Sequence, residues 1–307
     1  MNNLDFIDKK ISHNQIIILD GATGTELEKR GVAMNSSAWS AEAVLTSPET
    51  VQAVHEDYIR AGADIITCNS FSLAKHMLIR AELAQHFHRA NADSVKLAVK
   101  ARENIGRNPV AIAGSIAPTT FCSGEQKCFP PSSTALSWYK EQAEILAGSG
   151  ADLLIIEMIE DVDQGSMAVE AALTTGLPVW LGFSCRKNLD GEIMLWGQRH
   201  SLAEGIDTII RIGGDAALIM HTETREAAEA LAVLRSRYQG KLGVYAHSGL
   251  FIMPNWQFSD IISPEAYASE ARNWVSMGAE IIGGCCGIGP AHIRLLKEVL
   301  TIQEDRL

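Results

Sequence analysis

The stretch AGADIITCNS, residues 61–70, places a glycine-containing turn and an acidic residue before an apolar run that has the length of a strand. The same phrase returns three times, as SGADLLIIEM at 149–158, GGDAALIMHT at 213–222 and MGAEIIGGCC at 277–286. An apolar run without polar alternation is typical of a parallel strand that is covered on both faces. The phrase therefore predicts four buried strands in a repeating architecture.

Four more apolar runs lie between these phrases, which makes eight strands in all. They are IIILD at 16–20, PVAIAGS at 109–115, PVWLGFS at 178–184 and KLGVYAHS at 241–248. Helical patterns fill the intervals; the segment 47–62, for example, begins with Ser47 as an N-cap before Pro48 and closes on a glycine. The alternation predicts a (β/α)8 TIM barrel, one α/β domain over residues 1–307. A doubly wound open sheet is the alternative, but no GxGxxG motif follows the first strand, and eight units favour closure.

Composition and charge limit the partners of the chain. Of its 307 residues 47% are hydrophobic, and the formal net charge is -11. Because no stretch is rich in Lys and Arg, neither nucleic acid nor an anionic membrane is an expected partner. The N-terminal segment is too polar for a signal peptide, and no apolar run reaches transmembrane length. We therefore expect a cytoplasmic protein whose six cysteines are thiols or metal ligands, and association into a homo-oligomer stays open.

Functional residues of such barrels gather at the carboxyl ends of the strands. In this sequence the predicted ends are dominated by thiols, imidazoles, carboxylates and small polar groups. They are Asp20, Cys68, Asn69, Ser115, Glu157, Ser184, Cys185, His221, His247, Ser248, Cys285 and Cys286. This collection predicts a reactive or metal-binding site at that end of the barrel.

The adjacent thiols of Cys285 and Cys286, in GGCCG at 283–287, allow three interpretations. Buried structural cysteines need no special partners, but two of them on a glycine turn are unusual in that role. A disulfide between neighbours strains the backbone, and the cytosol disfavours it. Two thiolates can instead bind one tetrahedral Zn²⁺ if the flanking glycines let the backbone aim both sulfurs, and a third protein ligand then leaves one position for a substrate.

These residues resemble the homocysteine S-methyltransferases, zinc-dependent barrels that methylate a thiol. The resemblance rests on GGCCG at 283–287, LDGATGTELEKRG at 19–31, the segment 39–71, GSIAP at 114–118 and the glutamate of the fourth strand, and it covers nearly the whole chain. It implies zinc bound by Cys285, Cys286 and a third cysteine, with the thiol of the substrate as the fourth ligand.

The sequence departs from that family at two strand ends. The third cysteine of the family closes the sixth strand, where this chain has ALIMHTETREAAEAL, and the spacing to the next helix places His221 in that position. Histidine is a good zinc ligand, so we predict a site of His221, Cys285 and Cys286. Cys68, Cys122, Cys185 and His247 are the reserve ligands. YAHSG at 245–249 keeps Ser248 but has His247 where relatives carry an amide, on the side of the methyl donor.

Two carboxylates at strand ends need a cationic partner or another role. Asp20 precedes GATGTEL, whose backbone N–H groups open a helix and could hold an anion, while an N-cap role is the alternative. Glu157 interrupts an otherwise apolar strand, and an unpaired buried carboxylate is costly. The resemblance implies that Asp20 and Glu157 bind the amino group of homocysteine and that the amides of Gly21 and Ala22 bind its carboxylate, with Asn69 and Ser248 completing the substrate site. Three acids that follow, Glu160, Asp161 and Asp163, are expected to be solvated loop charges.

The sequence thus predicts a zinc-dependent enzyme that moves a methyl group from a small sulfonium or quaternary ammonium donor to the thiol of homocysteine. S-methylmethionine is the favoured donor and betaine the second. Methylation of a different thiol, a zinc-dependent lyase or aldolase, and a non-catalytic zinc-binding descendant are the alternatives. Two soft thiolates argue against the lyase, since sites that handle oxygen favour His and carboxylate ligands.

Overall fold

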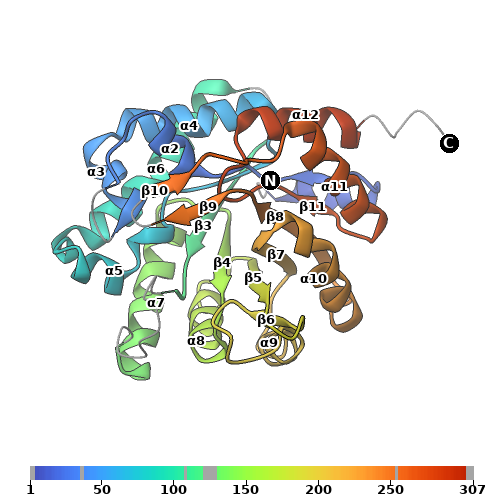
Figure 1. The fold of residues 1–307 in the computed structure, drawn as a ribbon. Helices are drawn as coiled ribbons and strands as arrows, with labels where there is room; N and C mark the ends of the chain where they lie inside the picture. Colours follow the sequence, from blue (N-terminus) through green and yellow to red (C-terminus); the bar gives the residue numbers. More distant parts are fainter. Residues whose placement is uncertain (1–3, 35–37, 107–108, 120–129, 253–254, 302–307) are drawn as a thin grey trace.

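The computed structural model describes residues 4–34, 38–106, 109–119, 130–252 and 255–301, and these form a (β/α)8 TIM barrel (Figure 1). The eight barrel strands are the ones that the repeated phrase and the runs between its copies predict. They are β1 (Ile17–Ile18), β2 (Ile65–Thr67), β3 (Ala111–Ile116), β4 (Leu153–Ile159), β5 (Val179–Lys187), β7 (Ala216–Glu223), β8 (Lys241–His247) and β11 (Ile281–Ile282).

All neighbouring barrel strands are parallel, in the order β1-β11-β8-β7-β5-β4-β3-β2. A parallel bridge between Leu19 and Ile65 joins the two ends of this order, and the amide of Asp20 donates to the carbonyl of Ile65 at 3.0 Å. The barrel is therefore closed, and the doubly wound alternative is wrong.

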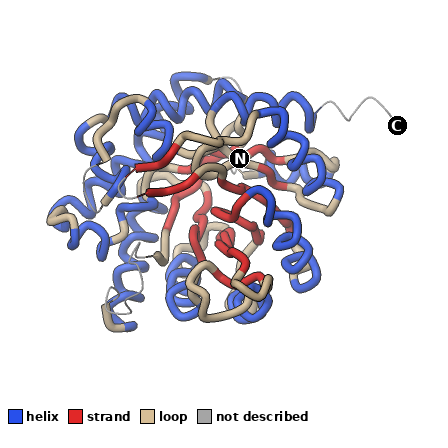
Figure 2. The backbone as a smooth tube through the Cα atoms, viewed as in Figure 1, coloured by secondary structure: helices blue, strands red, loops and turns tan. Residues whose placement is uncertain are grey.

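Alternate residues of each strand enter two different apolar cores, which explains the continuous apolar runs in the sequence. Ile17, Ile65 and Ile281 belong to a cluster that fills the barrel, whereas Ile18 and Ile282 belong to the larger cluster between the sheet and the helices. The strands lie at the centre of the molecule, and the helices surround them (Figure 2).

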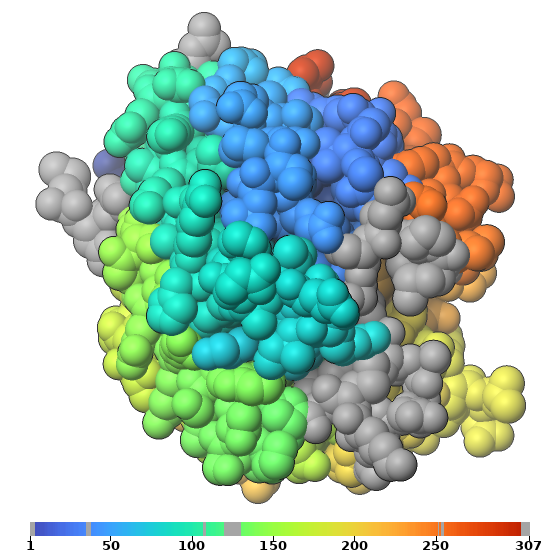
Figure 3. Space-filling view, turned by 90° about the vertical axis from the view of Figure 1, so that its left-hand side faces the viewer, coloured from blue at the N-terminus to red at the C-terminus, as the bar shows by residue number. Residues whose placement is uncertain are grey.

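The helices occupy the intervals that the sequence assigned to them. They are α1 (Asp5–Ser12), α2 (Thr23–Lys29), α3 (Ala43–Thr46), α4 (Pro48–Ala61), α5 (Lys75–Arg80), α6 (Phe87–Ile105), α7 (Ser132–Gly148), α8 (Val162–Leu173), α9 (Leu202–Ile209), α10 (Thr224–Arg237), α11 (Pro264–Ser276) and α12 (Pro290–Thr301). Segments from the first half of the chain, blue to light green, cover one side of the barrel (Figure 3). None of the helices that the structure describes is long and apolar enough to cross a membrane.

Helix α4 begins and ends where its sequence pattern places the boundaries. Pro48 occupies the first turn after Ser47, and Gly62 closes the helix with a φ of 102°, a left-handed conformation that glycine adopts at little cost. Ser47 is the N-cap residue, as predicted, although its side chain makes no capping hydrogen bond.

Three short strands lie outside the repeat, and the sequence did not predict them. Strand β6 (Ile193–Leu195) pairs antiparallel with β5, and β9 (Leu250–Ile252) pairs antiparallel with β10 (Asn255–Gln257). The β9–β10 hairpin follows β8, so it belongs to the carboxyl end of the barrel (Figure 1).

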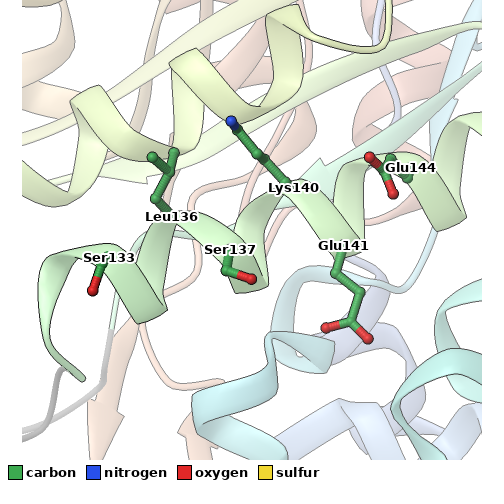
Figure 4. Close-up of a pocket in the computed structure, with 6 residues that line it drawn as sticks. All are labelled: Ser133, Leu136, Ser137, Lys140, Glu141 and Glu144. Carbon is green, nitrogen blue, oxygen red and sulfur yellow. The ribbon is translucent and has the colours of Figure 1, made fainter.

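A pocket of about 440 Å³ lies on the surface of α7 (Figure 4). Its lining comes from one face of that helix: Ser133, Leu136, Ser137, Lys140, Glu141 and Glu144. Glu141 accepts hydrogen bonds from Lys75 and His88 at 2.6 and 2.7 Å, so its charge is already matched. The pocket includes none of the predicted site residues.

The imidazole of His55 on α4 gives the fold a specific dependence on pH. It is fully buried, neither ring nitrogen has a hydrogen-bond partner, and burial lowers its pKa to about 4. Because the unfolded chain takes up the proton near the ordinary pKa of about 6.5, the contribution of His55 to stability is complete above that pH and falls as the pH drops toward 4.

We expect about 3 kcal/mol of unfolding free energy to be lost over this interval, and His55→Leu to remove that part of the loss. Urea denaturation at a series of pH values from 7 to 4 measures it. His13→Leu, a change of an exposed histidine, is the matched control. An unchanged pH profile in His55→Leu would assign the acid sensitivity to other groups.

Candidate functional site

Three soft ligand atoms meet at the carboxyl ends of β7 and β11. His221 Nδ1 lies 3.4 Å from Cys285 Sγ, and the two sulfurs of Cys285 and Cys286 lie 4.0 Å apart. Ligand atoms of all three residues lie within 4.8 Å of one another. The structure therefore brings together the three side chains that the sequence predicts as a metal site.

The glycines around the two cysteines are required by close backbone contacts. A Cβ on Gly284 would lie 2.2 Å from the side chain of Ile288, and one on Gly287 would lie 2.2 Å from the carbonyl of Ser248. Gly287 also has a φ of 83°, which disfavours residues with a side chain. The amide of Cys285 donates to the carbonyl of Ala246 at 2.9 Å, so the turn that carries the thiols is bonded to β8.

His221 points into the site because the strand is irregular there. The pairing of β7 with β8 shifts register between Met220 and Glu223, and His221 has a φ of 42°, an uncommon value for a residue with a side chain. Strained residues of this kind cluster at functional sites, where the surrounding structure holds them in place. Ser184 supports the conformation by donating to the carbonyl of His221 at 3.2 Å.

The three donors fit a tetrahedral zinc ion. Zn–S bonds of about 2.3 Å and Zn–N bonds of about 2.0–2.1 Å give ligand separations of about 3.5–3.8 Å, close to the two distances above. Two cysteines and one histidine are also a donor set that zinc accepts, with a fourth position left for a substrate.

Without a bound cation Cys285 and His221 favour their neutral forms. The neighbouring Cys286 thiol and burial raise the pKa of Cys285 well above its usual value. Burial, followed by the neighbouring His247, lowers the pKa of His221 well below its usual value. A divalent cation would reverse the balance at the thiols, because coordination favours the thiolate.

Two buried carboxylates, those of Asp20 and Glu157, interact electrostatically with each other, and Glu157 also interacts with Cys285. Asp20 accepts from the amide of Thr67 at 2.7 Å and from its hydroxyl at 3.1 Å, and Glu157 accepts from the hydroxyl of Ser115. Burial raises the pKa of both, and the charge of Glu157 raises those of Asp20 and Cys285 further. Neither carboxylate has an ion-pair partner among the residues that the structure describes, so both can receive a cationic group of a ligand.

Glu157, like His221, lies at a strand irregularity. The pairing of β4 with β5 shifts between Ile156 and Ile159, and Met158 has a φ of 59°. Such bulges re-aim a side chain at the rim of a barrel.

The remaining predicted substrate residues already bond to the protein. The amide of Ala22 donates to the carbonyl of Ile288 at 3.0 Å, and the side chain of Ser248 accepts from the amide of Ile262 at 2.8 Å. Both ends of the Asn69 side-chain amide bond to Ser40, at 2.9 and 3.1 Å. These residues hold the loops around the site, and their contact with a substrate stays a prediction, as does that of Gly21.

The reserve thiols have other partners. Cys68 contacts the hydroxyl of Ser70 at 3.2 Å, and Cys185 contacts that of Thr222 at 3.3 Å. Both are buried, and burial raises the pKa of Cys185 to about 12. Neither belongs to the group of His221, and Cys122 lies outside the described residues.

Of the three acids expected to be solvated, only Asp163 is highly exposed. Asp161 caps α8 by accepting from two backbone amides, at 3.0 and 3.1 Å. Glu160 is partly buried, accepts from the hydroxyl of Thr119, and has its pKa raised by burial to about 7. The expectation was therefore wrong for Glu160, which bonds to a residue that follows β3, and for Asp161, whose side chain is 13% exposed and pairs with Arg199 at 2.9 Å.

Two tryptophans beside the metal group were missed by the sequence reasoning. Trp196 follows β6, and Trp256 lies on β10. Their ring centroids lie 5.4 and 6.2 Å from that of His221. The sequence offered only a weak signal, since neither residue ends a strand of the repeat.

Comparisons with known proteins find relatives over nearly the whole chain. A family model described as Homocysteine S-methyltransferase matches residues 17–300. The homocysteine S-methyltransferase of Escherichia coli strain K12 is 30% identical, over 94% of this chain and 96% of that protein. The selenocysteine methyltransferase of Astragalus bisulcatus is 26% identical, over 92% of each chain. The solved structure of the E. coli homocysteine methyltransferase MmuM in its metallated form is similar with a TM-score of 0.80 and 27% identity, over 97% of this chain and 99% of that one.

The geometry of the metal group predicts which thiols hold zinc. We expect the protein to bind zinc in a one-to-one ratio and to lose it when Cys285 or Cys286 is changed to Ala, because two ligands hold zinc poorly where three are needed. Elemental analysis after dialysis against a weak chelator measures it, and Cys185→Ala is the control that removes a buried thiol outside the group. Zinc retained in both single variants, or absent from a wild-type protein that also fails to take up added zinc, would contradict the assignment.

Proposed function

The chain belongs to the homocysteine S-methyltransferase family and is a methyltransferase, and we propose that it uses zinc to transfer a methyl group from a small onium donor to homocysteine, giving methionine. The proposal rests on one observation. Three residues of the types that bind zinc lie in the same site as two buried carboxylates, and neither carboxylate has an ion-pair partner among the described residues. An amino-acid thiol as acceptor requires two things of a site: a group that binds and activates its sulfur, and a group that binds its ammonium.

His221, Cys285 and Cys286 would hold the zinc. When bound, zinc supplies a Lewis acid that keeps the sulfur of the acceptor deprotonated at neutral pH. A lone pair of that sulfur forms a new bond to the methyl carbon, and the bond from this carbon to the donor breaks with its electron pair on the departing sulfur or nitrogen. The sulfur or nitrogen that carried the methyl group is therefore neutral when the donor leaves.

The carboxylates of Asp20 and Glu157 would bind the ammonium group of the acceptor. Their raised pKa values fall back when a cation arrives, because the charged forms then gain a partner in a water-poor site. The carboxylate of the acceptor would lie against the amide of Gly21 at the start of α2, while the amide of Ala22 would first exchange its bond to Ile288. Asn69 and Ser248 would keep the surrounding loops in position.

His221 bears on the identity of the donor. Two thiolates and one neutral imidazole balance the charge of Zn²⁺, whereas three thiolates would leave the site with a negative charge. The sulfur of the acceptor then has a lower pKa, and nucleophilicity falls as the pKa of a thiol falls. A strongly activated sulfonium such as S-methylmethionine is therefore the first candidate, and betaine is the second.

A second candidate acceptor is another thiol or selenol of an amino acid. The similarity to a selenocysteine methyltransferase and the exchange of a family cysteine for His221 both favour testing it. Rates with homocysteine, cysteine and selenocysteine under one donor would rank the acceptors.

Changing Glu157 to Gln tests the recognition of the ammonium group. The substitution keeps the shape and removes the charge, so we expect homocysteine to bind more weakly by about 1.5–3 kcal/mol, the range for a hydrogen bond to a charged group. Calorimetric titration of the zinc-loaded protein measures the affinity, with Glu160→Gln as a control at a nearby carboxylate. Equal affinity in Glu157→Gln and wild type would show that this glutamate does not meet the acceptor.

Substitutions of His221 test the link between donor set and donor choice. We expect His221→Cys to retain zinc and to raise the rate with betaine relative to S-methylmethionine, since a third thiolate makes the acceptor sulfur more nucleophilic. His221→Ala should bind zinc weakly. Zinc content and the two rates are measured for all three proteins, and full zinc content with unchanged rates in His221→Ala would place the third ligand elsewhere.

A further inference from the structure

Two short segments outside the barrel repeat, the end of strand β6 and the β9–β10 hairpin, each bring one tryptophan to the same pair of imidazoles. The ring centroid of Trp196 lies 5.4 Å from that of His221 and 6.1 Å from that of His247. The ring centroid of Trp256 lies 6.2 and 5.7 Å from the same two rings. The ring centroids of the two imidazoles are 4.5 Å apart, so the four aromatic rings form one cluster that includes the candidate metal ligand His221.

Specific hydrogen bonds fix both tryptophans in place. The amide of Trp196 donates to the carbonyl of Ser184 at 2.8 Å, which anchors the end of β6 to β5. The amide of Trp256 donates to Glu28 on α2, and its indole N–H donates to the carbonyl of Ser248, both at 3.2 Å. With its indole N–H bonded to the backbone, the ring of Trp256 is held at one orientation.

Two features of this cluster are typical of a binding surface and are not explained by core packing alone. His247 is only 4% exposed, yet its Nδ1 atom has no hydrogen-bond partner, although buried ring nitrogens are normally bonded. Trp196 is only partly buried, and the guanidinium of Arg186 lies 4.9 Å from its ring centroid. The cluster thus already attracts a cation, and Arg186 has no ion-pair partner among the described residues.

We infer that Trp196, Trp256 and His247 form an aromatic cage for the methyl-bearing cationic centre of the donor, next to the metal ligand His221. A sulfonium or quaternary ammonium centre has no N–H or O–H to donate, so aromatic faces are the groups that recognise it best. The cage holds the onium centre of the donor and loses its attraction once the methyl group has left, because that sulfur or nitrogen is then neutral. The guanidinium of Arg186 would meet a carboxylate on the donor. The inference rests on the proposed function and adds to it the residues that select the donor.

Binding of donor analogues without an acceptor tests the cage. Calorimetry on the zinc-loaded protein would compare betaine and S-methylmethionine with 3,3-dimethylbutanoate, which has the shape of betaine without its positive charge. We expect both cations to bind at least tenfold more tightly than the neutral-headed analogue, and Trp196→Leu and Trp256→Leu each to weaken cation binding by about 5- to 30-fold. The Phe variants at both positions should retain most of the affinity because they keep an aromatic face.

Phe258→Leu, a change of an exposed aromatic residue just after β10, is the matched control, and zinc content and thermal stability are measured for every variant. Equal binding of 3,3-dimethylbutanoate and betaine, or unchanged cation affinity in both folded Leu variants, would overturn the cage. If the wild type methylates homocysteine but the Leu variants keep the donor KM, the cage fails and the proposed function stands. If the Leu variants lose cation binding but no methyl transfer is found, the cage stands and the proposed function fails.

Discussion

Backbone hydrogen bonds on both sides of the turn after β11 fix the two cysteines of the site relative to Asp20. The amide of Gly284 donates to the carbonyl of Asp20, and the amide of Cys285 donates to that of Ala246, each at 2.9 Å. These bonds exist only because closure of the barrel brings β11 between β1 and β8. The turn that carries the two thiols is therefore bonded to the residue that carries one of the carboxylates, so the distance between the candidate metal ligands and the Asp20 carboxylate is set by the sheet.

Much of this arrangement could be predicted from the sequence, because parallel strands leave a repeated pattern. A strand buried on both faces must be apolar throughout, and its carboxyl end is where polar residues begin, so Asp20, Glu157 and the two cysteines were found by position alone. His221 was chosen as the third candidate ligand because the resemblance places a cysteine there and the spacing to α10 matches. Such positions can be read along the sequence even where, as at Glu157 and His221, the pairing of the strand is irregular.

The irregular parts of the backbone could not be predicted from the sequence. The bulges at Glu157 and His221 depend on how neighbouring strands pair, which no local pattern encodes. The segments that position Trp196 and Trp256 are too short to show alternation, and they are held by bonds to Ser184 and Glu28, residues distant in the sequence. The same holds for the amide of Ala22, which was expected to be open for a ligand and donates instead to the carbonyl of Ile288, after the neighbouring strand β11.

The site concentrates groups that a core would normally exclude, and the proposed acceptor would satisfy them. Unpaired carboxylates, an unbonded ring nitrogen at His247 and the left-handed backbone of His221 each cost free energy in the ligand-free fold. The two apolar cores on either face of the strands keep the barrel rigid enough to hold them. An analogue that lacked the ammonium group would leave Asp20 and Glu157 buried without a partner, whereas an amino-acid thiol supplies the missing charge and a soft ligand together. Such a site discriminates between ligands mainly because a wrong ligand leaves buried polar groups without a partner. The extra contacts that the right ligand makes matter less.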